Sequence, residues 1–302
     1  MTGDWALPIT HAIAAVAAFA LVLVVGATGQ TKHSAWPETA PPKLAVLVYA
    51  RYAFDRTAES GRALAGAARA CAKLEVPNSW IVMDSVSGEQ EMLSFDPFDS
   101  FAQINKAFDT WPAIYAAHSE LGKLQAQINS SLTSQRTIIA ARRDDLSYRA
   151  MRIDLSKARY LRVLEVRVHP GHEGQFAEAF QKLGAATEKA ESDLPWVVYQ
   201  ANAGMPSPAF FALTPMRTLA QNDDLLDQGE RLREAEAETA GRMEQIAREA
   251  YAYTESNLYA IRPEKSHVSK EFAAGDPEFW TPKPEAPAKA MVRKSTTDKP
   301  KQ

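Results

Sequence analysis

The segment Trp80-Ile-Val-Met-Asp84 has a counterpart in Trp196-Val-Val-Tyr-Gln200, which lies 116 residues further along the chain. Both segments are short apolar runs rich in β-branched residues, as is typical of a strand. A glycine follows each tryptophan by eight residues, at Gly88 and Gly204, where we expect a hairpin turn. This repetition indicates two copies of one structural unit.

The segments around these two strands give each copy the order β-α-β-β-α-β. That order predicts a ferredoxin-like unit, an antiparallel sheet with both helices on one face. Because the other face is apolar and must be covered, we expect the two sheets to pack on each other. The further matched segments are Leu44–Tyr49 with Tyr160–Val168, Thr57–Glu75 with His172–Ser192, Phe95–Pro97 with Leu213–Pro215, and Thr137–Arg142 with Asn257–Arg262.

Several local motifs extend this pattern to a known superfamily. Val166–Phe176 reads strand, Pro-Gly, charged residue, helix, whereas Tyr52–Arg56 in the first half has no Pro-Gly. With these motifs the chain resembles the dimeric α+β barrel superfamily, which includes antibiotic-biosynthesis-monooxygenase-like and NIPSNAP-like domains. It is also similar to exported bacterial proteins with two tandem units and no established activity, through Arg143–Tyr148, Ala158–Leu161, Ser266–Val268 and Asp276–Trp280.

The resemblance implies an α+β fold in which two tandem ferredoxin-like (βαββαβ) units pack sheet to sheet. The product is an intramolecular pseudo-dimeric α+β barrel. We expect this division of the chain: signal peptide 1–27, linker 28–42, first unit 43–150, second unit 151–268, and C-terminal extension 269–302 with a disordered basic tail from about 281.

The N-terminus predicts export to the periplasm or the extracellular space. Residues 12–27 are apolar and uncharged, and the run is shorter than the ~20 residues of a spanning helix. Val25-Gly26-Ala27 is an acceptable cleavage site, although the preceding residues include Asp4 and no lysine or arginine. After cleavage we expect the protein not to remain inserted in the membrane. The alternative is an uncleaved segment that anchors the protein.

Composition excludes several function classes. The 302 residues carry a formal charge of −3, and the pI is about 6.1, so we expect no nucleic-acid partner. The single cysteine, Cys71, excludes an intrachain disulfide framework and is interpreted as a buried, inert thiol. The chain has no GxxxxGK[ST], GxGxxG or GxSxG motif. We therefore predict no cofactor. For the oligomeric state, we expect either a monomer with an internal pseudo-dimer or a homo-oligomer.

The long helical stretch of the first half holds the most interesting candidate. Apolar residues from Phe101 to Leu132, Phe108 among them, recur at three- and four-residue spacing and are expected to face the sheet. An equivalent stripe runs from Leu225 to Tyr253 in the second half, and Pro112 is expected to restart the first helix. His118 falls on this stripe beside Trp111 and Tyr115. A neutral imidazole there would act as a general base or orient a ligand, or would simply be hydrogen-bonded in the core.

Two further residues complete the set of candidate ligand-binding residues, which are Trp111, Tyr115, His118, Asp84 and Tyr199. Asp84 and Tyr199 follow the repeated tryptophans and are expected near the space between the sheets, whereas both tryptophans are interpreted as core residues. His169 and His172 flank Pro170-Gly171 and are interpreted as a solvated turn. Zinc normally needs at least three protein ligands, so we predict no metal.

These patterns favour a non-catalytic protein that binds a small apolar molecule between a sheet and the long helices. One alternative is a cofactor-independent monooxygenase-like enzyme, which the resemblance implies only through the fold. In that case His118, Tyr115, Trp111 and Asp84 are expected to converge on one pocket. The second alternative is a structural protein that oligomerises through its long helices.

Overall fold

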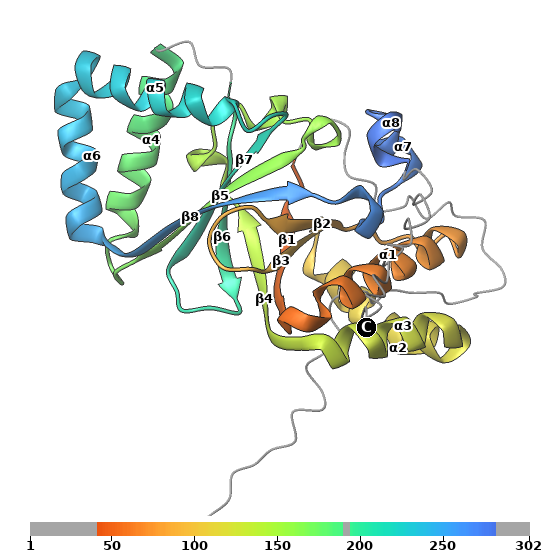
Figure 1. The fold of residues 1–302 in the computed structure, drawn as a ribbon. Helices are drawn as coiled ribbons and strands as arrows, with labels where there is room; N and C mark the ends of the chain where they lie inside the picture. Colours follow the sequence, from red (N-terminus) through yellow and green to blue (C-terminus); the bar gives the residue numbers. More distant parts are fainter. Residues whose placement is uncertain (1–40, 190–193, 282–302) are drawn as a thin grey trace, which may run out of the picture.

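Eight antiparallel strands close into one barrel, in the order β1-β3-β2-β8-β5-β7-β6-β4 (Figure 1). The computed structural model describes residues 41–189 and 194–281. The predicted signal peptide, most of the linker and the predicted basic tail lie outside the described residues. The strands are β1 Leu44–Tyr52, β2 Ile81–Ser85, β3 Met92–Phe98, β4 Leu132–Arg142, β5 Tyr160–Val168, β6 Val197–Ala203, β7 Ala209–Met216 and β8 Tyr251–Ile261.

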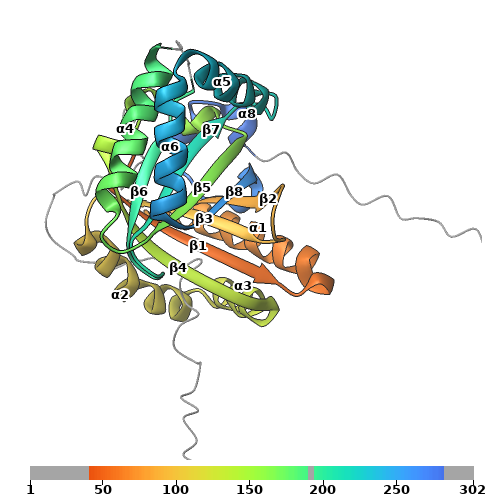
Figure 2. The ribbon, with the colours of Figure 1, turned by 90° about the vertical axis from the view of Figure 1, so that its left-hand side faces the viewer.

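The barrel consists of two sheets with the same strand order. The first is β4-β1-β3-β2 and the second is β8-β5-β7-β6, and ladders between β2 and β8 and between β4 and β6 join them (Figure 2). This arrangement confirms the predicted α+β fold, a pseudo-dimeric barrel of tandem ferredoxin-like units. The sheets therefore face each other across the interior and also pair edge to edge.

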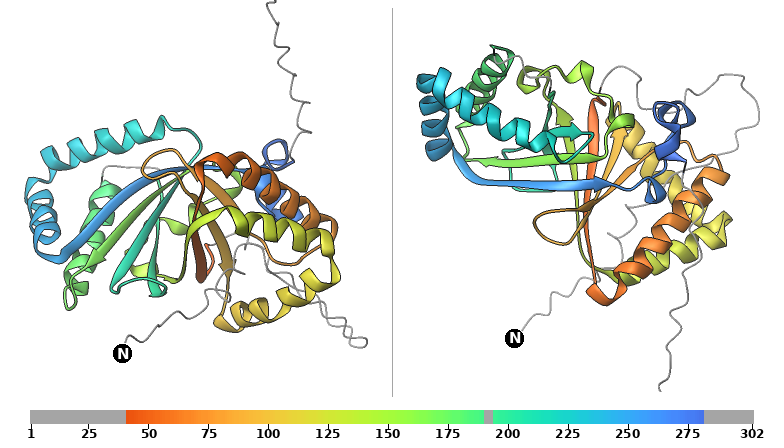
Figure 3. Two further views of the ribbon diagram at one scale, coloured as in Figure 1. Left: turned by 60° about the horizontal axis from the view of Figure 1, so that its bottom comes forward. Right: turned by 45° about the horizontal axis from the view of Figure 1, so that its top comes forward.

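The helices form one layer outside each sheet, on opposite sides of the barrel (Figure 3). Buried apolar residues such as Ile104, Trp111 and Ile128 fill the first layer, and Phe176, Phe210 and Ile246 fill the second. The helices are α1 Thr57–Lys73, α2 Phe101–Ala117, α3 Ser119–Ser131, α4 Glu173–Lys189, α5 Gln221–Ala235 and α6 Ala237–Ala250. Short 3₁₀ turns are Phe54–Arg56, Asp144–Leu146, Ala150–Arg152, Leu155–Lys157 and Pro263–Lys265.

The helix break in the first unit lies at His118, and the prediction of a restart at Pro112 was wrong. Helix α2 continues through Pro112 to Ala117, and His118, at φ −125° and ψ 84°, separates it from α3. Phe101 and Phe108, expected to face the sheet, are 52% and 43% exposed. The reason is that other side chains occupy the inward side of α2: Ile104, Ala107, Trp111 and Ile114.

The fourth strand of each unit is longer than predicted. β4 begins at Leu132 rather than Thr137, and β8 begins at Tyr251 rather than Asn257. Tyr253, expected on the helical stripe, therefore belongs to β8. The matched register also shifts by one residue, because the amides of Arg143 and Arg262 bond the equivalent carbonyls of Val198 and Val82.

The repeated tryptophans are buried, as predicted. Trp80 is 5% exposed and Trp196 is 8% exposed, and each pairs by an isolated bridge with the segment after its neighbouring fourth strand. Their indole Nε1 atoms donate to the backbone carbonyls of Lys265 and Leu146, at 3.2 and 3.0 Å. The repeated tryptophan is thus held by the same kinds of contact in both units.

Apolar side chains fill one end of the barrel interior. The segment between the units closes this end together with two short helices, α7 Lys270–Ala273 and α8 Pro277–Trp280. Trp280 is 6% exposed and donates its Nε1–H to the Ser156 carbonyl at 2.7 Å. No described helix is both long and apolar enough to cross a membrane.

Candidate functional site

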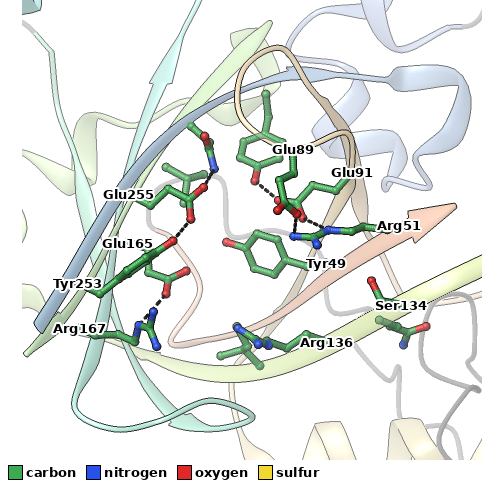
Figure 4. Close-up of a pocket in the computed structure, with 15 residues that line it drawn as sticks. Tyr49, Arg51, Glu89, Glu91, Ser134, Arg136, Glu165, Arg167, Tyr253 and Glu255 are labelled. Atoms are coloured by element: carbon green, nitrogen blue, oxygen red, sulfur yellow. Dashed lines mark hydrogen bonds and ion pairs between the residues drawn. The ribbon is translucent and has the colours of Figure 1, made fainter. Parts of the chain in front are cut away.

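A cavity of about 480 Å³ occupies the opposite end of the barrel, and we call it the mouth cavity (Figure 4). Side chains from β1, β4, β5 and β8 line it, together with the turn between β2 and β3. The lining residues are Tyr49, Arg51, Glu89, Glu91, Ser134, Gln135, Arg136, Ile138, Val163, Glu165, Arg167, Tyr253, Glu255, Asn257 and Tyr259.

Strand periodicity explains why one interior is apolar at one end and charged at the other. Side chains on a strand alternate between the two faces, so every second residue points into the barrel. On both β1 and β5 the first two inward positions are apolar and the next two are polar. These positions are Ala45, Leu47, Tyr49 and Arg51 on β1, and Leu161, Val163, Glu165 and Arg167 on β5.

Two glutamates of the cavity already have hydrogen-bond partners. Glu91 accepts from the Tyr259 hydroxyl at 2.7 Å and from Arg51 Nε at 3.3 Å. Glu255 accepts from the Tyr253 hydroxyl and, at 2.9 Å, from Asn257 Nδ2. These two bonds lower the pKa of Glu255, the tyrosine first. Hydrogen bonds therefore hold both carboxylates in place, and the lowered pKa keeps Glu255 ionised.

Three other groups retain unused hydrogen-bonding capacity. Among the described residues, the Tyr49 hydroxyl and the Arg136 guanidinium make no hydrogen bond or ion pair, and both point into the cavity (Figure 4). The Glu165 carboxylate forms an ion pair with Arg167 Nε at 3.5 Å, too long for a strong hydrogen bond. Tyr49 and Arg136 are direct cross-strand partners on β1 and β4.

Burial changes the pKa values of Glu165 and Tyr49. Desolvation raises the pKa of Glu165, and Arg167 opposes the shift. Desolvation also raises the pKa of Tyr49, and Glu165, Glu91 and Glu255 add to this shift while Arg136 opposes it. Tyr49 therefore remains a hydroxyl donor, and Glu165 keeps its proton to a higher pH than a solvated glutamate.

Three of the five predicted site residues lie together in the helix layer of the first unit. Trp111 is 1% exposed and stacks on Tyr115, with ring centroids 5.2 Å apart. The Tyr115 hydroxyl donates to Gln125 Oε1 at 2.9 Å. His118 is half-buried at the helix break beyond them. None of these three residues lines the mouth cavity.

The other two predicted residues lie elsewhere. Asp84, at the seam between β2 and β8, accepts from Arg262 Nε at 2.9 Å and from Lys265 Nζ at 2.7 Å. Tyr199 is buried in the apolar end of the barrel and donates to the Pro42 carbonyl at 2.9 Å. In the described part of the chain, no group of three or more His, Cys, Asp or Glu side chains is placed to hold a metal ion.

A second cavity, of about 220 Å³, lies between the second sheet and its helices α4 and α5; we call it the helix–sheet cavity. The sequence predicted a small-molecule site between a sheet and the long helices, but its candidate residues Trp111, Tyr115 and His118 lie in the first unit and do not line this cavity. Arg162 lies among its apolar residues and donates from Nε to Ser256 Oγ at 2.9 Å. Its lining is Arg162, Leu164, Phe180, Leu183, Ala186, Thr187, Trp196, Ala212, Thr214, Leu225 and Gly229.

Sequence reasoning missed the mouth cavity, although a signal for it is present in β5. Along Tyr160-Leu-Arg-Val-Leu-Glu-Val-Arg-Val168 the first charged residue, Arg162, falls on the outer face. The next two, Glu165 and Arg167, fall on the inner face. Such a change of face within one strand of a closed barrel indicates an interior that becomes polar towards one end.

Comparisons with solved structures find the same fold at low sequence identity. An anthrone oxidase-like protein superposes with a TM-score of 0.50 at 17% identity, covering 74% of this chain and 93% of that one. A mutant chlorite dismutase from Candidatus Nitrospira defluvii gives 0.44 at 8%, covering 74% and 92%. A heme-binding protein from Thermus thermophilus gives 0.41 at 10%, covering 78% and 97%. No family model and no curated protein sequence matches the chain.

Proposed function

We propose that the protein binds a small polar molecule carrying an anionic group in the mouth cavity. The observation that carries this proposal is a pair of donors, Tyr49 and Arg136, that have no partner in the described part of the chain. They lie side by side on neighbouring strands and face a cavity of about 480 Å³. A guanidinium with five donors and no partner is a suitable receptor for a carboxylate or phosphate.

The surroundings of the cavity support binding in a fixed orientation. The apolar core beneath it is packed and provides a rigid floor, while hydrogen bonds hold Glu91 and Glu255. Polar groups fixed in this way give specificity, because a ligand must match them to enter. The lining includes no histidine, cysteine or lysine, the residues that most often supply a catalytic base or an activated nucleophile, which favours binding over covalent catalysis.

The experiment is to identify small molecules that co-purify with the full chain by mass spectrometry. Ser134→Trp places an indole in the mouth cavity, and Ser119→Trp, on the exposed start of α3, is the matched control. We expect a molecule that accompanies the wild type and the control but is absent from Ser134→Trp. Identical extracts from all three proteins would contradict the proposal.

The helix–sheet cavity favours a second candidate, the small apolar ligand that the sequence predicted. Its lining is mainly aliphatic and aromatic, and the Arg162 side chain has no carboxylate within ion-pair distance among the described residues. Burial lowers the pKa of Arg162, so an anionic head group on an apolar ligand would relieve the desolvated charge. Leu183→Trp would fill this cavity without affecting the mouth cavity, and loss of a bound lipid-like molecule would support the candidate.

A cofactor-independent monooxygenase-like activity remains the alternative prediction. The likeness to the anthrone oxidase-like protein concerns the fold, and Glu165 is the cavity group best suited to accept a proton. Oxygen uptake with anthrone that is present in the wild type and lost in Glu165→Gln would favour the enzyme. The oligomerising alternative predicts a solution mass above one chain, and export predicts recovery outside the cytoplasm.

The residues of the two cavities do not fit a haem, the group implied by some proteins of this fold. Neither lining includes a histidine, cysteine or methionine. Tyrosine can also bind haem iron, but the hydroxyls of Tyr253 and Tyr259 donate to glutamates. The raised pKa of Tyr49, caused by its burial, opposes the phenolate that would be the ligand.

A further inference from the structure

The two halves of the mouth cavity have opposite chemistry at equivalent positions. Residue pairing along β1–β4 and β5–β8 makes Tyr49 equivalent to Glu165 and Arg136 equivalent to Glu255. The first unit therefore presents two hydrogen-bond donors, and the second presents two carboxylates at the same height in the barrel. Two identical chains would place the same residues on both sides, whereas a tandem fusion permits this difference.

From this opposition, and resting on the proposed function, we infer that the ligand is amphoteric. Its anionic group binds Arg136 and the Tyr49 hydroxyl, and a cationic or hydrogen-bond-donating group binds Glu165. The chemical class is thus a small amino acid or a similar zwitterion.

The charge balance of the cavity agrees with a ligand of no net charge. Three arginines and four glutamates line it, and Glu165 has a raised pKa. With Glu165 ionised, as an ammonium partner requires, the formal sum of these side chains is −1. Arg51 is paired with Glu89 and Glu91, and Arg167 is paired with Glu165. A ligand of one sign would still meet a like charge at one side, because Arg136 lies opposite the carboxylates of Glu165 and Glu255.

Glu165 is the carboxylate of the lining left for the second ligand group, since Glu89 is paired with Arg51. The oxygens of Glu91 and Glu255 already accept bonds from tyrosine and other donors. The contact of Glu165 with Arg167 is an ion pair at 3.5 Å, and the guanidinium of Arg167 also lies over the Tyr253 ring, 4.0 Å from its centroid. Hydrogen bonds between ionised groups are stronger than neutral ones, so an ammonium group would find its best partner here.

The test is titration calorimetry of the full chain with three matched ligand series. These are ω-amino acids from glycine to 6-aminohexanoate, the carboxylates of the same chain lengths, and the amines of the same chain lengths, each to about 10 mM, which detects millimolar dissociation constants. We expect one ω-amino acid to bind at least about ten-fold more tightly than its matched carboxylate and amine, a difference of about 1.4 kcal/mol.

Substitutions separate the contributions of the ligand's ammonium and carboxylate groups to its affinity. Glu165→Gln is expected to reduce amino-acid affinity to that of the matched carboxylate, and Arg136→Gln to that of the matched amine. Glu238→Gln and Arg248→Gln on the exposed side of α6 are the controls and should change neither affinity.

The outcomes distinguish the two proposals. Equal affinity for an amino acid and its carboxylate, with both lost in Arg136→Gln, would overturn the amphoteric ligand and leave the anion-binding function standing. If no member of the three series binds, the amphoteric ligand is overturned. The mouth-blocking substitution Ser134→Trp then decides separately whether the cavity binds any other molecule.

Discussion

Asp96→Asn should stabilise the protein at neutral and alkaline pH. Asp96 points from β3 into the helix layer of the first unit, where the Ser94 hydroxyl donates to it at 2.5 Å. Desolvation by burial raises its pKa from 3.8 to about 7, against the lowering effect of Ser94. The equivalent residue of the second unit is Thr214, which is uncharged. An asparagine keeps the hydrogen-bond acceptor and removes the charge.

The magnitude follows from the linkage between protonation and folding. A pKa that is about 3 units higher in the folded state corresponds to about 4 kcal/mol at most, at 1.36 kcal/mol per unit. Asp96 is only half-buried as a residue, so water relieves part of the penalty, and we expect about 2 kcal/mol. Below about pH 3 both states hold the proton and the penalty is absent, and it grows once the pH passes the unfolded value of 3.8. Wild-type stability then falls, relative to the variant, as pH rises to about 7.

The assay is urea unfolding at pH 5 and pH 8, with Asp227→Asn on the exposed side of α5 as the control. We expect Asp96→Asn to exceed the wild type at pH 8 and to show a much smaller difference at pH 5, while the control follows the wild type at both. A variant that is no more stable at pH 8, or a difference independent of pH, would refute the reasoning.

Three further predictions concern stability and are measured by the same unfolding assay. Gly204→Ala should lower the free energy of unfolding by about 2 kcal/mol more than Gly171→Ala does. Both glycines have positive φ, but a Cβ at Gly204 would lie 2.0 Å from a backbone oxygen, and equal losses would contradict this reasoning. Ser147→Ala and Ser266→Ala should cost similar amounts, about 1–3 kcal/mol each, because each hydroxyl donates at 2.7 Å to a carbonyl and accepts at 2.9 Å from a strand amide; a neutral effect at one site would contradict the pseudo-symmetry. Trp280→Ala should cost about 3–5 kcal/mol by opening the apolar end of the barrel, and a loss below 1 kcal/mol would show that this end closes without it.

The fold could be predicted because the repeated strands carry their apolar residues at regular positions. Trp80 and Trp196 are each followed by two β-branched residues and lie at the same distance from a glycine, and each indole donates to a backbone carbonyl. The strand order followed from the element order alone, since a ferredoxin-like unit has one arrangement of its four strands. The closing of the two sheets into a barrel followed from their uncovered faces.

The mouth cavity could not be predicted in the same way, because its side chains interrupt the apolar pattern. Tyr253 and Glu255 follow a helix without a break in the chain, so the start of β8 was assigned to that helix. Arg136 lies one residue before the predicted start of its strand for the same reason. At His118 a helix was predicted where there is none. Its spacing places it on the helical stripe, but in the structure it lies at the break between α2 and α3.

The two seams of the barrel have a consequence for how the chain can be divided. Each unit contributes one strand to the β2–β8 seam and one to the β4–β6 seam. A cut within the connecting segment Ala150–Lys157 would therefore release two fragments, each with a pair of hydrogen-bonding edges exposed to other strands. The fragments should aggregate when made separately and reconstitute the barrel when made together, so the protein offers a split-protein system whose halves recognise each other through backbone edges.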